Sequence, residues 1–140
     1  MAGESSRPTV RTPPRMQPFW DAAGDGRLSV QRCRACAATY FPAVDICNGC
    51  LGNELEWVTT SGTGTVFSFA VMHHVYHPAF ADRVPYAVVD VQLDDGPRMI
   101  TTVVDCEPAS LRIGMAVEVD FERLDDGRAL PVFRVRNGSV

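Results

Sequence analysis

Four of the five cysteines in this chain stand in two closely spaced pairs, Cys33 with Cys36 and Cys47 with Cys50. Ten residues separate the pairs, which gives the spacing C-x2-C-x10-C-x2-C. Two such turns can complete the tetrahedron that Zn²⁺ prefers, and four thiolates leave no coordination position for water. We therefore predict a structural zinc site that stabilises the fold. A redox-active pair is the alternative, but it would need a thioredoxin-like βαβ context that the sequence lacks.

All three histidines, His73, His74 and His77, fall in one segment together with Tyr76 and Pro78. A histidine metal site would need a helix to bring His73 and His77 onto one face, and Pro78 with its β-rich flanks argues against a helix. General acid–base catalysis by one imidazole is a second alternative. We expect instead a loop whose aromatic and imidazole groups pack against the rest of the chain or against a partner.

No other motif indicates that the chain is a catalyst by itself. Cys106 stands between Asp105 and Glu107, which disfavour a reactive thiolate, so we expect an inert thiol. The 13 basic residues are all arginine, which excludes lysine Schiff-base and pyridoxal chemistry and a GxxxxGK[ST] phosphate loop. The glycines of Ser61–Thr65 are therefore interpreted as a turn.

Length and charge narrow the class of protein. The chain has 140 residues, which fits one compact domain or a small domain with a stapled appendage. No apolar run approaches the roughly 20 residues that cross a bilayer, and the first residues have no apolar signal segment, so we predict a cytoplasmic protein without membrane contact. Residues 58–140 carry seven arginines against eleven acidic residues. Nucleic-acid binding requires clustered cations and is therefore the weaker alternative.

Composition predicts three parts. Residues 1–17 are rich in proline, arginine and serine and are expected to form a flexible arm. Residues 18–57 contain the cysteines, preceded by a short helix over 18–23 that begins with proline and ends at Gly24 or Gly26. Residues 58–140 read as strands.

The third part predicts a small barrel. Alternating or β-rich segments cover 65–72, 86–93, 99–104, 116–124 and 130–135, with a short helical connection at 108–114. Asp-Asp-Gly sequences beginning at Asp94 and Asp125 mark hairpin turns. Three strands, a helical link and two more strands follow the plan of an OB-fold, with Pro131 near an edge or a bulge. An ordinary five-stranded sandwich is the alternative. The predicted fold class is mainly β: a short helix, a rubredoxin-like zinc ribbon and a five-stranded OB barrel.

The order of these segments resembles a known family. The stretches "PFW", "GRLSVQRCRAC", "LEWVTTSGTGTVFSF", "PYAVVDVQLDDGPRMITTVV" and "LRIGMAVEVDFE" are similar to zinc-ribbon and OB-fold proteins catalogued as a domain of unknown function and encoded beside thiolases. The match covers nearly everything after Gln17. Some members of that family have lost ligand cysteines, whereas this chain keeps all four.

The resemblance implies an accessory subunit without catalytic residues of its own. Its partner would be a thiolase-fold enzyme acting on acyl-CoA thioesters (a thiolase, an acyltransferase or a lipid-transfer-protein-like aldolase that shortens steroid side chains), in a hetero-oligomer such as a heterotetramer. The barrel would help to bind or channel acyl-CoA, with Arg83 and Arg98 as candidates for the CoA phosphates. The predicted partner-facing residues are Phe19, Trp20, Tyr40, Phe41, His73, His74, Tyr76 and His77.

Alternatives remain for these residues and for the function. Phe19 and Trp20 are adjacent and point in different directions, so internal packing is the alternative for both. A free-standing enzyme that binds acyl-CoA and uses His73, His74 or His77 is the second functional hypothesis. A nucleic-acid-binding OB module is the third.

Overall fold

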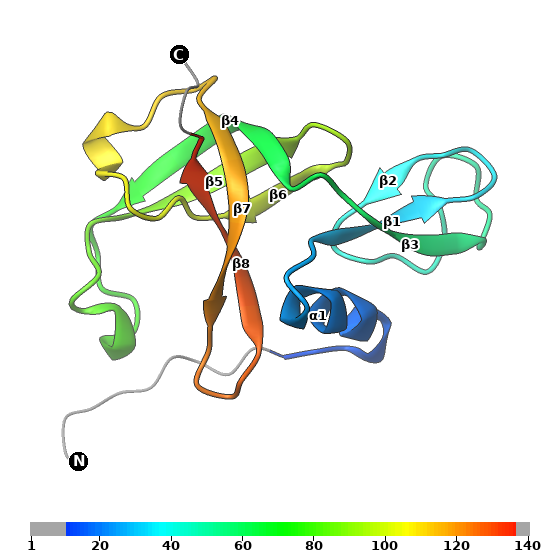
Figure 1. Cartoon of the computed structure of the whole chain (residues 1–140), viewed down its shortest axis with the longest axis horizontal. Helices are drawn as coiled ribbons and strands as arrows, with labels where there is room; N and C mark the ends of the chain where they lie inside the picture. The colour runs from blue at the N-terminus through cyan, green and yellow to red at the C-terminus, as the bar shows by residue number, and fades with distance from the viewer. Residues whose placement is uncertain (1–10, 137–140) are drawn as a thin grey trace.

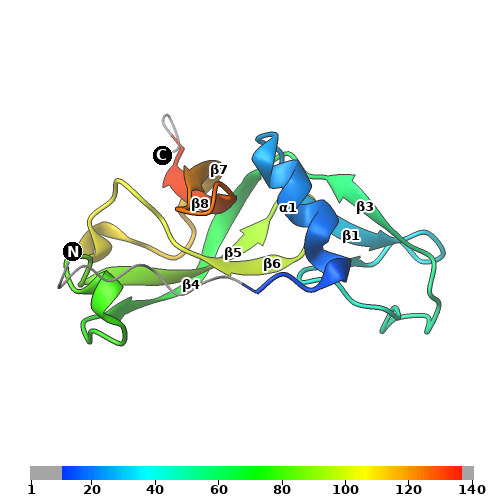
Figure 2. The same ribbon diagram turned by 90° about the horizontal axis from the view of Figure 1, so that it is seen from below.

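The computed structural model describes residues 11–136 and contains two small β-sheets with a helix beside them (Figure 1). A three-stranded sheet forms the cysteine ribbon, and a five-stranded sheet curls into the barrel. Seen from below, the helix α1 lies between the ribbon strands and the β7–β8 hairpin of the barrel (Figure 2). None of the helices within residues 11–136 has the length and apolar character needed to cross a bilayer.

The helix α1 spans Gln17–Gly24 and follows a 3-10 turn, η1, at Pro14–Met16. Proline in its first turn fixes φ where no intrahelical donor is needed, and Gly26 takes the left-handed conformation (φ 80°) after its end. The predicted helix over 18–23 is therefore confirmed. Residues 1–10 of the predicted arm lie outside the described residues, and its remainder carries η1 and the first residue of α1.

The ribbon sheet consists of β1 (Ser29–Cys33), β2 (Thr39–Tyr40) and β3 (Leu55–Thr59), in the order β2-β1-β3. Every residue of β1 pairs with one of β3, from Ser29 opposite Thr59 to Cys33 opposite Leu55. The strand β3 runs across the boundary that the sequence predicts between residues 57 and 58. The chain therefore leaves the ribbon as a paired strand, not as a free linker.

Five strands form the barrel. They are β4 (Thr63–Met72), β5 (Tyr86–Leu93), β6 (Arg98–Thr101), β7 (Ala116–Arg123) and β8 (Ala129–Val135), with 3-10 turns η2 (Pro78–Phe80) and η3 (Pro108–Ser110). Their order is β6-β5-β4-β7-β8, all antiparallel. The alternating burial of β5 matches the predicted strand 86–93.

The two edge strands approach each other and close the barrel. Val103, just after β6, forms a parallel bridge with Phe133 of β8. The N–H of Val104 donates to the carbonyl of Phe133, and the N–H of Phe133 donates to the carbonyl of Thr102. Strand order and closure define an OB-fold and exclude the sandwich. Pro131 lies on the edge strand β8, as predicted.

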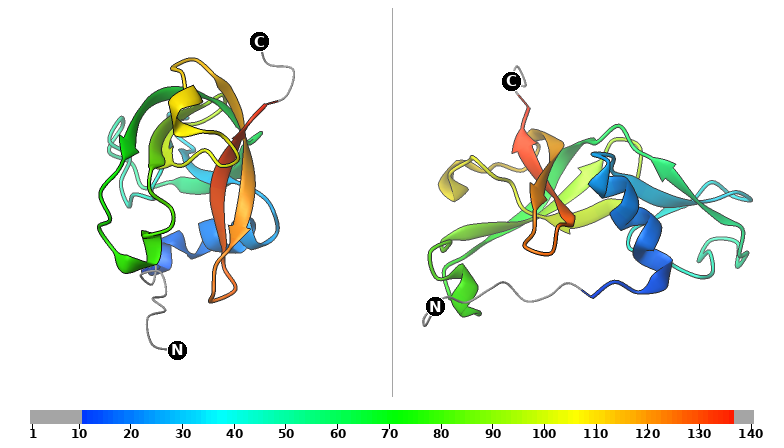
Figure 3. Two further views of the ribbon diagram at one scale, coloured as in Figure 1. Left: turned by 90° about the vertical axis from the view of Figure 1, so that its left-hand side faces the viewer. Right: turned by 60° about the horizontal axis from the view of Figure 1, so that its bottom comes forward.

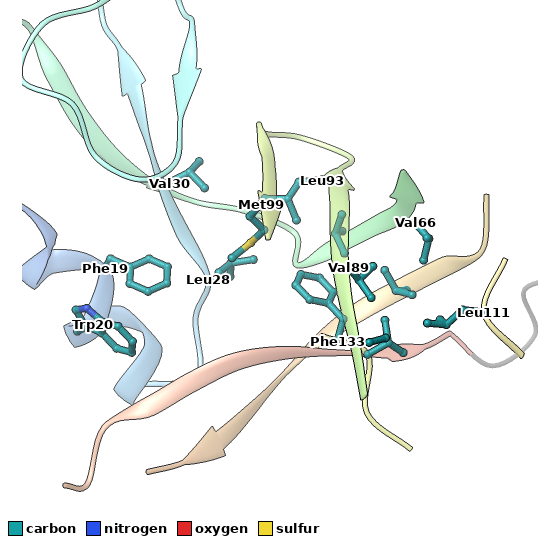
Figure 4. Packing of buried hydrophobic residues seen from close by; sticks show 14 residues of the cluster. Phe19, Trp20, Leu28, Val30, Val66, Val89, Leu93, Met99, Leu111 and Phe133 are labelled. Carbon is teal, nitrogen blue, oxygen red and sulfur yellow. The ribbon is translucent and has the colours of Figure 1, made fainter. Parts of the chain in front are cut away.

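One hydrophobic core joins the helix, the ribbon and the barrel (Figure 4). Phe19 of α1 and Leu28 beside β1 continue into the barrel interior, where Val89 and Phe133 are fully buried. The cation Arg128 lies over the ring of Trp20, 5.1 Å from its centroid, and links the helix to the β7–β8 hairpin. The parts are therefore packed together and not merely tethered.

The connection between β3 and β4 is held by the β5–β6 turn. Ser61 donates its N–H to the Asp95 carboxylate at 2.8 Å, and the Thr63 hydroxyl donates to Asp94 at 2.6 Å. Gly62 takes a left-handed φ of 79° in this connection. The predicted turn at Ser61–Thr65 is thus half correct, because β4 already begins at Thr63. The Asp-Asp-Gly turn, predicted only as a hairpin signal, also fixes the ribbon to the barrel.

Candidate functional site

Two tight turns hold the four cysteines, and both have the same hydrogen-bond pattern. In each turn, the residue that follows the second cysteine donates its N–H to the carbonyl of the first cysteine. The first cysteine donates its own N–H to the carbonyl of the second residue after the pair. The two sets are Cys33 with Ala37 and Ala38, and Cys47 with Leu51 and Gly52, all at 2.8 Å. Ala37 and Leu51 consequently have positive φ angles of 68° and 62°. This conformation normally favours glycine. Here it turns the chain so that the two sulfurs of each pair point toward the same position.

The four sulfur atoms lie within 4.8 Å of one another. The Sγ atoms of Cys33 and Cys50 are 3.6 Å apart, and those of Cys36 and Cys47 are 3.4 Å apart. A tetrahedral Zn²⁺ with bonds of about 2.3 Å places its sulfur ligands about 3.8 Å apart. The donor set and its geometry therefore fit a structural zinc ion. Within residues 11–136, no other group of three or more His, Cys, Asp or Glu side chains converges in this way.

Tyr40 supports the metal-binding sulfur of Cys47. Its hydroxyl lies 3.0 Å from the Cys47 Sγ and accepts the N–H of Asn48 at 2.9 Å. The Tyr40 hydroxyl and then the backbone N–H of Cys50 lower the pKa of Cys47 to about 6, with a further contribution from the Gly49 N–H. Among the four sulfurs, the thiolate of Cys47 is therefore the one that these contacts favour at neutral pH. The sequence predicts Tyr40 as a partner-facing residue and gives no sign of this contact.

The aromatic residues predicted to face a partner near the ribbon mostly pack inside the chain. Phe19 is 2% exposed and Trp20 is 9% exposed. Phe19 contacts the ring of Phe41 at 4.9 Å and the edge of Trp20 at 5.2 Å. The alternative of internal packing is therefore what the structure shows for Phe19 and Trp20, while Tyr40 and Phe41 are half-buried. A partner contact by any of these four residues stays a prediction.

The three histidines lie in the connection between β4 and β5 and do not form a cluster. His73 and His74 are exposed, and the ring of His74 stacks edge-on against Tyr76 at 4.5 Å. His77 is half-buried and accepts the N–H of Ala79 through Nδ1 at 3.0 Å, which caps η2. No carboxylate or thiol converges with them into a metal site among residues 11–136. A partner contact by His73, His74, Tyr76 and His77 stays a prediction.

The two arginines predicted to bind CoA phosphates lie in different surroundings. Arg83 follows η2 and approaches Glu122 at 3.9 Å. Arg98 begins β6, lies over the ring of Phe67 at 4.2 Å and approaches Asp90 at 3.8 Å. Both guanidinium groups are about half exposed. The structure does not bring them to one binding site, because Arg83 lies beside Glu122 of β7 and Arg98 beside Asp90 of β5.

A four-cysteine ribbon packed on an OB barrel defines a class of small zinc-ribbon and OB-fold proteins. Two family models match the chain in the same order: the rubredoxin-like zinc ribbon domain of ChsH2 over residues 20–56 and the C-terminal OB-fold domain of ChsH2 over residues 57–122. The chain belongs to the ChsH2/DUF35 family.

Three similar proteins illustrate the range of this family. A probable enoyl-CoA hydratase alpha subunit from Thermomonospora curvata is 41% identical over 117 residues, which are 83% of this chain and 36% of that protein. A DUF35 domain-containing scaffold protein from Methanocaldococcus jannaschii is 38% identical over 69% of this chain and 71% of its own length. The solved structure of the Ltp2-ChsH2(DUF35) aldolase contains a chain that superposes with a TM-score of 0.80 at 37% identity, covering 92% of this chain and 98% of that one. The chain thus spans little more than a third of the hydratase subunit.

Proposed function

We propose that this chain is a non-catalytic subunit that binds a thiolase-fold enzyme and helps to bind or channel its acyl-CoA substrate. The partner class comprises thiolases, acyltransferases and lipid-transfer-protein-like aldolases, in steroid side-chain or lipid metabolism. The complex would cleave or form carbon–carbon bonds or transfer acyl groups, with every catalytic residue on the partner.

The observation that carries this proposal is the metal centre. Its four thiolates would occupy all tetrahedral positions of a zinc ion, so the bound metal would have no position at which to activate water or polarise a carbonyl. The histidines are the remaining groups suited to proton transfer near neutral pH, and they are dispersed along one connection. Within residues 11–136 the structure therefore offers a rigid platform, and its chemistry suits an interaction subunit better than an enzyme.

The relatives support the same conclusion. One is described as a subunit of a hydratase, one as a scaffold protein, and one occurs in an aldolase together with Ltp2. Each description places the family in an assembly. The word CoA in the hydratase description supports an acyl-CoA thioester as the substrate class of the complex.

Co-expression with a thiolase-like protein encoded in the same genome tests the proposal. We expect the two chains to co-elute as a hetero-oligomer and to turn over an acyl-CoA substrate, whereas this chain alone shows no turnover. In the triple variant His73→Ala, His74→Ala and His77→Ala, the assembled complex should keep its kcat, because these side chains contribute at most to partner contact and not to chemistry. Turnover by the isolated chain at rates typical of enzymes, lost in that variant, would establish the stand-alone enzyme instead.

The CoA part of the proposal has a separate test. Arg98 is half exposed on the outer face of the barrel, 3.8 Å from Asp90, and we take it as the candidate for a phosphate contact. We expect Arg98→Gln to raise the KM of the complex for acyl-CoA and to leave kcat unchanged, because phosphate binding is remote from the reacting carbonyl. Arg112→Gln, at an exposed arginine of another connection, is the matched control and should change neither constant.

A further inference from the structure

A groove of about 850 Å³ lies on the outside of the barrel where β6 meets β8. The η2 segment and the β7–β8 hairpin flank it, and both project from the same end of the barrel (Figure 3). Its floor is mainly apolar and includes Tyr86, Val88, Ile100, Val104, Leu130 and Val132. These residues come from segments far apart in the sequence, so no local pattern announces the groove.

The floor presents one strongly exposed apolar side chain, that of Ile100, beside half-buried ones. Ile100 stands on the outer face of β6, opposite Asp90 of β5, and is 65% exposed. Covering apolar surface contributes roughly 25 cal/mol for each Å² removed from water. Apolar side chains gathered in a groove give a second molecule more surface to cover than a single exposed side chain does.

The rim of the groove is acidic. Its lining contains one guanidinium group, that of Arg83, which approaches Glu122 at 3.9 Å. Arg128 and Arg134 make ion pairs with two of the rim carboxylates, but Arg134 is shared with a further aspartate. The four carboxylates of the lining are Asp105, Glu122, Asp125 and Asp126. With Asp120 included, five carboxylates face three guanidinium groups, so a net negative charge remains around the floor although most of the carboxylates are paired.

An apolar floor with an acidic rim favours some components of the proposed complex over others as the bound molecule. The phosphates of CoA would meet carboxylates at the rim, and like charges at such distances repel. A cationic side chain beside apolar ones would instead bury its apolar part on the floor and pair its charge at the rim. The groove is thus unsuited to the CoA end of the substrate and suited to a basic, apolar stretch of polypeptide.

We infer that the groove receives a segment of the partner enzyme in which apolar side chains stand next to an arginine or a lysine. The inference rests on the proposed function, because the partner is the thiolase-fold subunit of that complex. It adds a defined docking surface on the barrel, away from the metal ribbon, and Ile100 at its floor is two residues from Arg98 on the same strand.

Two surface substitutions with matched controls test the inference on the full chain and the co-expressed partner. Ile100→Glu places a charge on the apolar floor, and Asp125→Arg reverses a charge on the rim. Each should weaken the complex about tenfold or more in titration calorimetry, which corresponds to about 1.4 kcal/mol. Ile113→Glu, at an isoleucine that is 71% exposed outside the groove, and Glu118→Arg on β7 should leave the affinity unchanged.

Cys106 supplies an independent readout, because its thiol lines the groove and is partly accessible. With the four ribbon cysteines bound to zinc, alkylation of Cys106 by iodoacetamide should proceed in the free chain and slow strongly in the complex. Mass spectrometry of the Cys106 peptide measures the rate, and Cys106→Ser identifies any background from the ribbon.

The outcomes separate this inference from the proposed function. If the complex forms with unchanged affinity in both groove variants and Cys106 stays reactive, the inference is wrong and the proposed function stands. If no thiolase-like partner binds the unmodified chain, both fail. If Cys106 is protected in the free chain and deletion of residues 1–10 exposes it, the occupant belongs to this chain and the inference is also wrong.

Discussion

The ribbon and the barrel of this protein are both built from β-strands, but different interactions stabilise their folds. In the ribbon, two of the fully buried side chains are the sulfur ligands Cys33 and Cys47, and every residue of β3 except the exposed Thr59 is only half-buried. In the barrel, Val89, Val91 and Phe133 exclude water completely. The comparison indicates that the ribbon depends on coordination bonds, whereas the barrel depends on apolar packing.

Removing the metal should have the largest effect and should affect one region. We expect a zinc chelator, or the substitution Cys47→Ser, to abolish amide protection in β1–β3 while the barrel strands keep theirs. Structural zinc contributes roughly 10 kcal/mol or more of apparent binding free energy at pH 7. Hydrogen exchange followed by mass spectrometry, with zinc content measured in parallel, checks this.

The control for the metal experiment is the fifth cysteine. Cys106→Ser should keep one zinc ion per chain and normal exchange in the ribbon, since this thiol lies outside the cluster. Retention of ribbon protection after complete metal removal would show that the apolar contacts of α1 and β1 are sufficient, and the contrast between the two regions would disappear.

The corresponding change in the barrel is Phe133→Ala. Phe133 is fully buried and lies at the closure of the sheet, so a cavity there should lower the free energy of unfolding by about 3–5 kcal/mol. Phe67→Ala, at a ring that is half exposed on the outer face, should cost about 1 kcal/mol or less. Urea denaturation monitored by circular dichroism measures both. Equal losses would contradict the assignment of the barrel core.

A smaller effect is expected where the start of β4 approaches β5. A Cβ atom at Gly64 would lie 2.6 Å from the backbone carbonyl oxygen of Gln92. Because backbone cannot yield as a side chain does, Gly64→Ala should lower stability by about 1–3 kcal/mol. Gly24→Ala is the control, since nothing lies within 4 Å of the new methyl group and the change should stay within about 0.5 kcal/mol. Thermal denaturation of the two variants gives the comparison.

The smallest effect concerns charge on the ribbon sheet. Arg32, with Arg34, holds the pKa of Glu56 below its ordinary value of 4.5. A lowered folded-state pKa means that this carboxylate stabilises the fold fully above pH 4.5 and loses that contribution as the pH falls through the lowered pKa. We expect Glu56→Gln to lower ribbon stability slightly at pH 7 and to match the unmodified protein at low pH.

Glu118→Gln on β7 is the control for this pH series, because it removes a carboxylate from the barrel instead of the ribbon. Denaturation midpoints recorded at several pH values with zinc kept bound, down to the pH at which the metal leaves, check the prediction. A difference between Glu56→Gln and the unmodified chain that grows as the pH falls would have the wrong sign and would contradict it.

Local patterns in the sequence predicted most of the fold. The spacing of Cys33 to Cys50 specified the metal site because metal geometry constrains sequence distance directly. The strand 86–93 was predicted with its observed bounds because its inward residues are apolar, and the Asp-Asp-Gly sequences located both hairpin turns. The short helix was predicted from proline at its start and glycine at its end.

What the sequence did not predict depends on contacts between distant residues. Tyr40 reaches Cys47, and Asp95 reaches Ser61, through hydrogen bonds that no local pattern encodes. Strand β3 escaped prediction because most of its side chains are half-buried, so it shows no clear alternation. The groove escaped because four separate segments assemble it. The features that the sequence did not predict are therefore mainly those that join the ribbon to the barrel and that would join the barrel to a partner.

The bridge between Val103 and Phe133 has a consequence for how readily the barrel opens between its two edge strands. A single parallel bridge and a few neighbouring hydrogen bonds hold the two edges together there, and the same stretch of backbone lies beneath the groove. A polypeptide bound across this contact would stabilise the closed barrel, because a ligand that binds only the closed form shifts the equilibrium toward that form by its binding free energy. The coupling is reciprocal, so a change that weakens the contact between the two edge strands would lower the affinity for that polypeptide by the same factor.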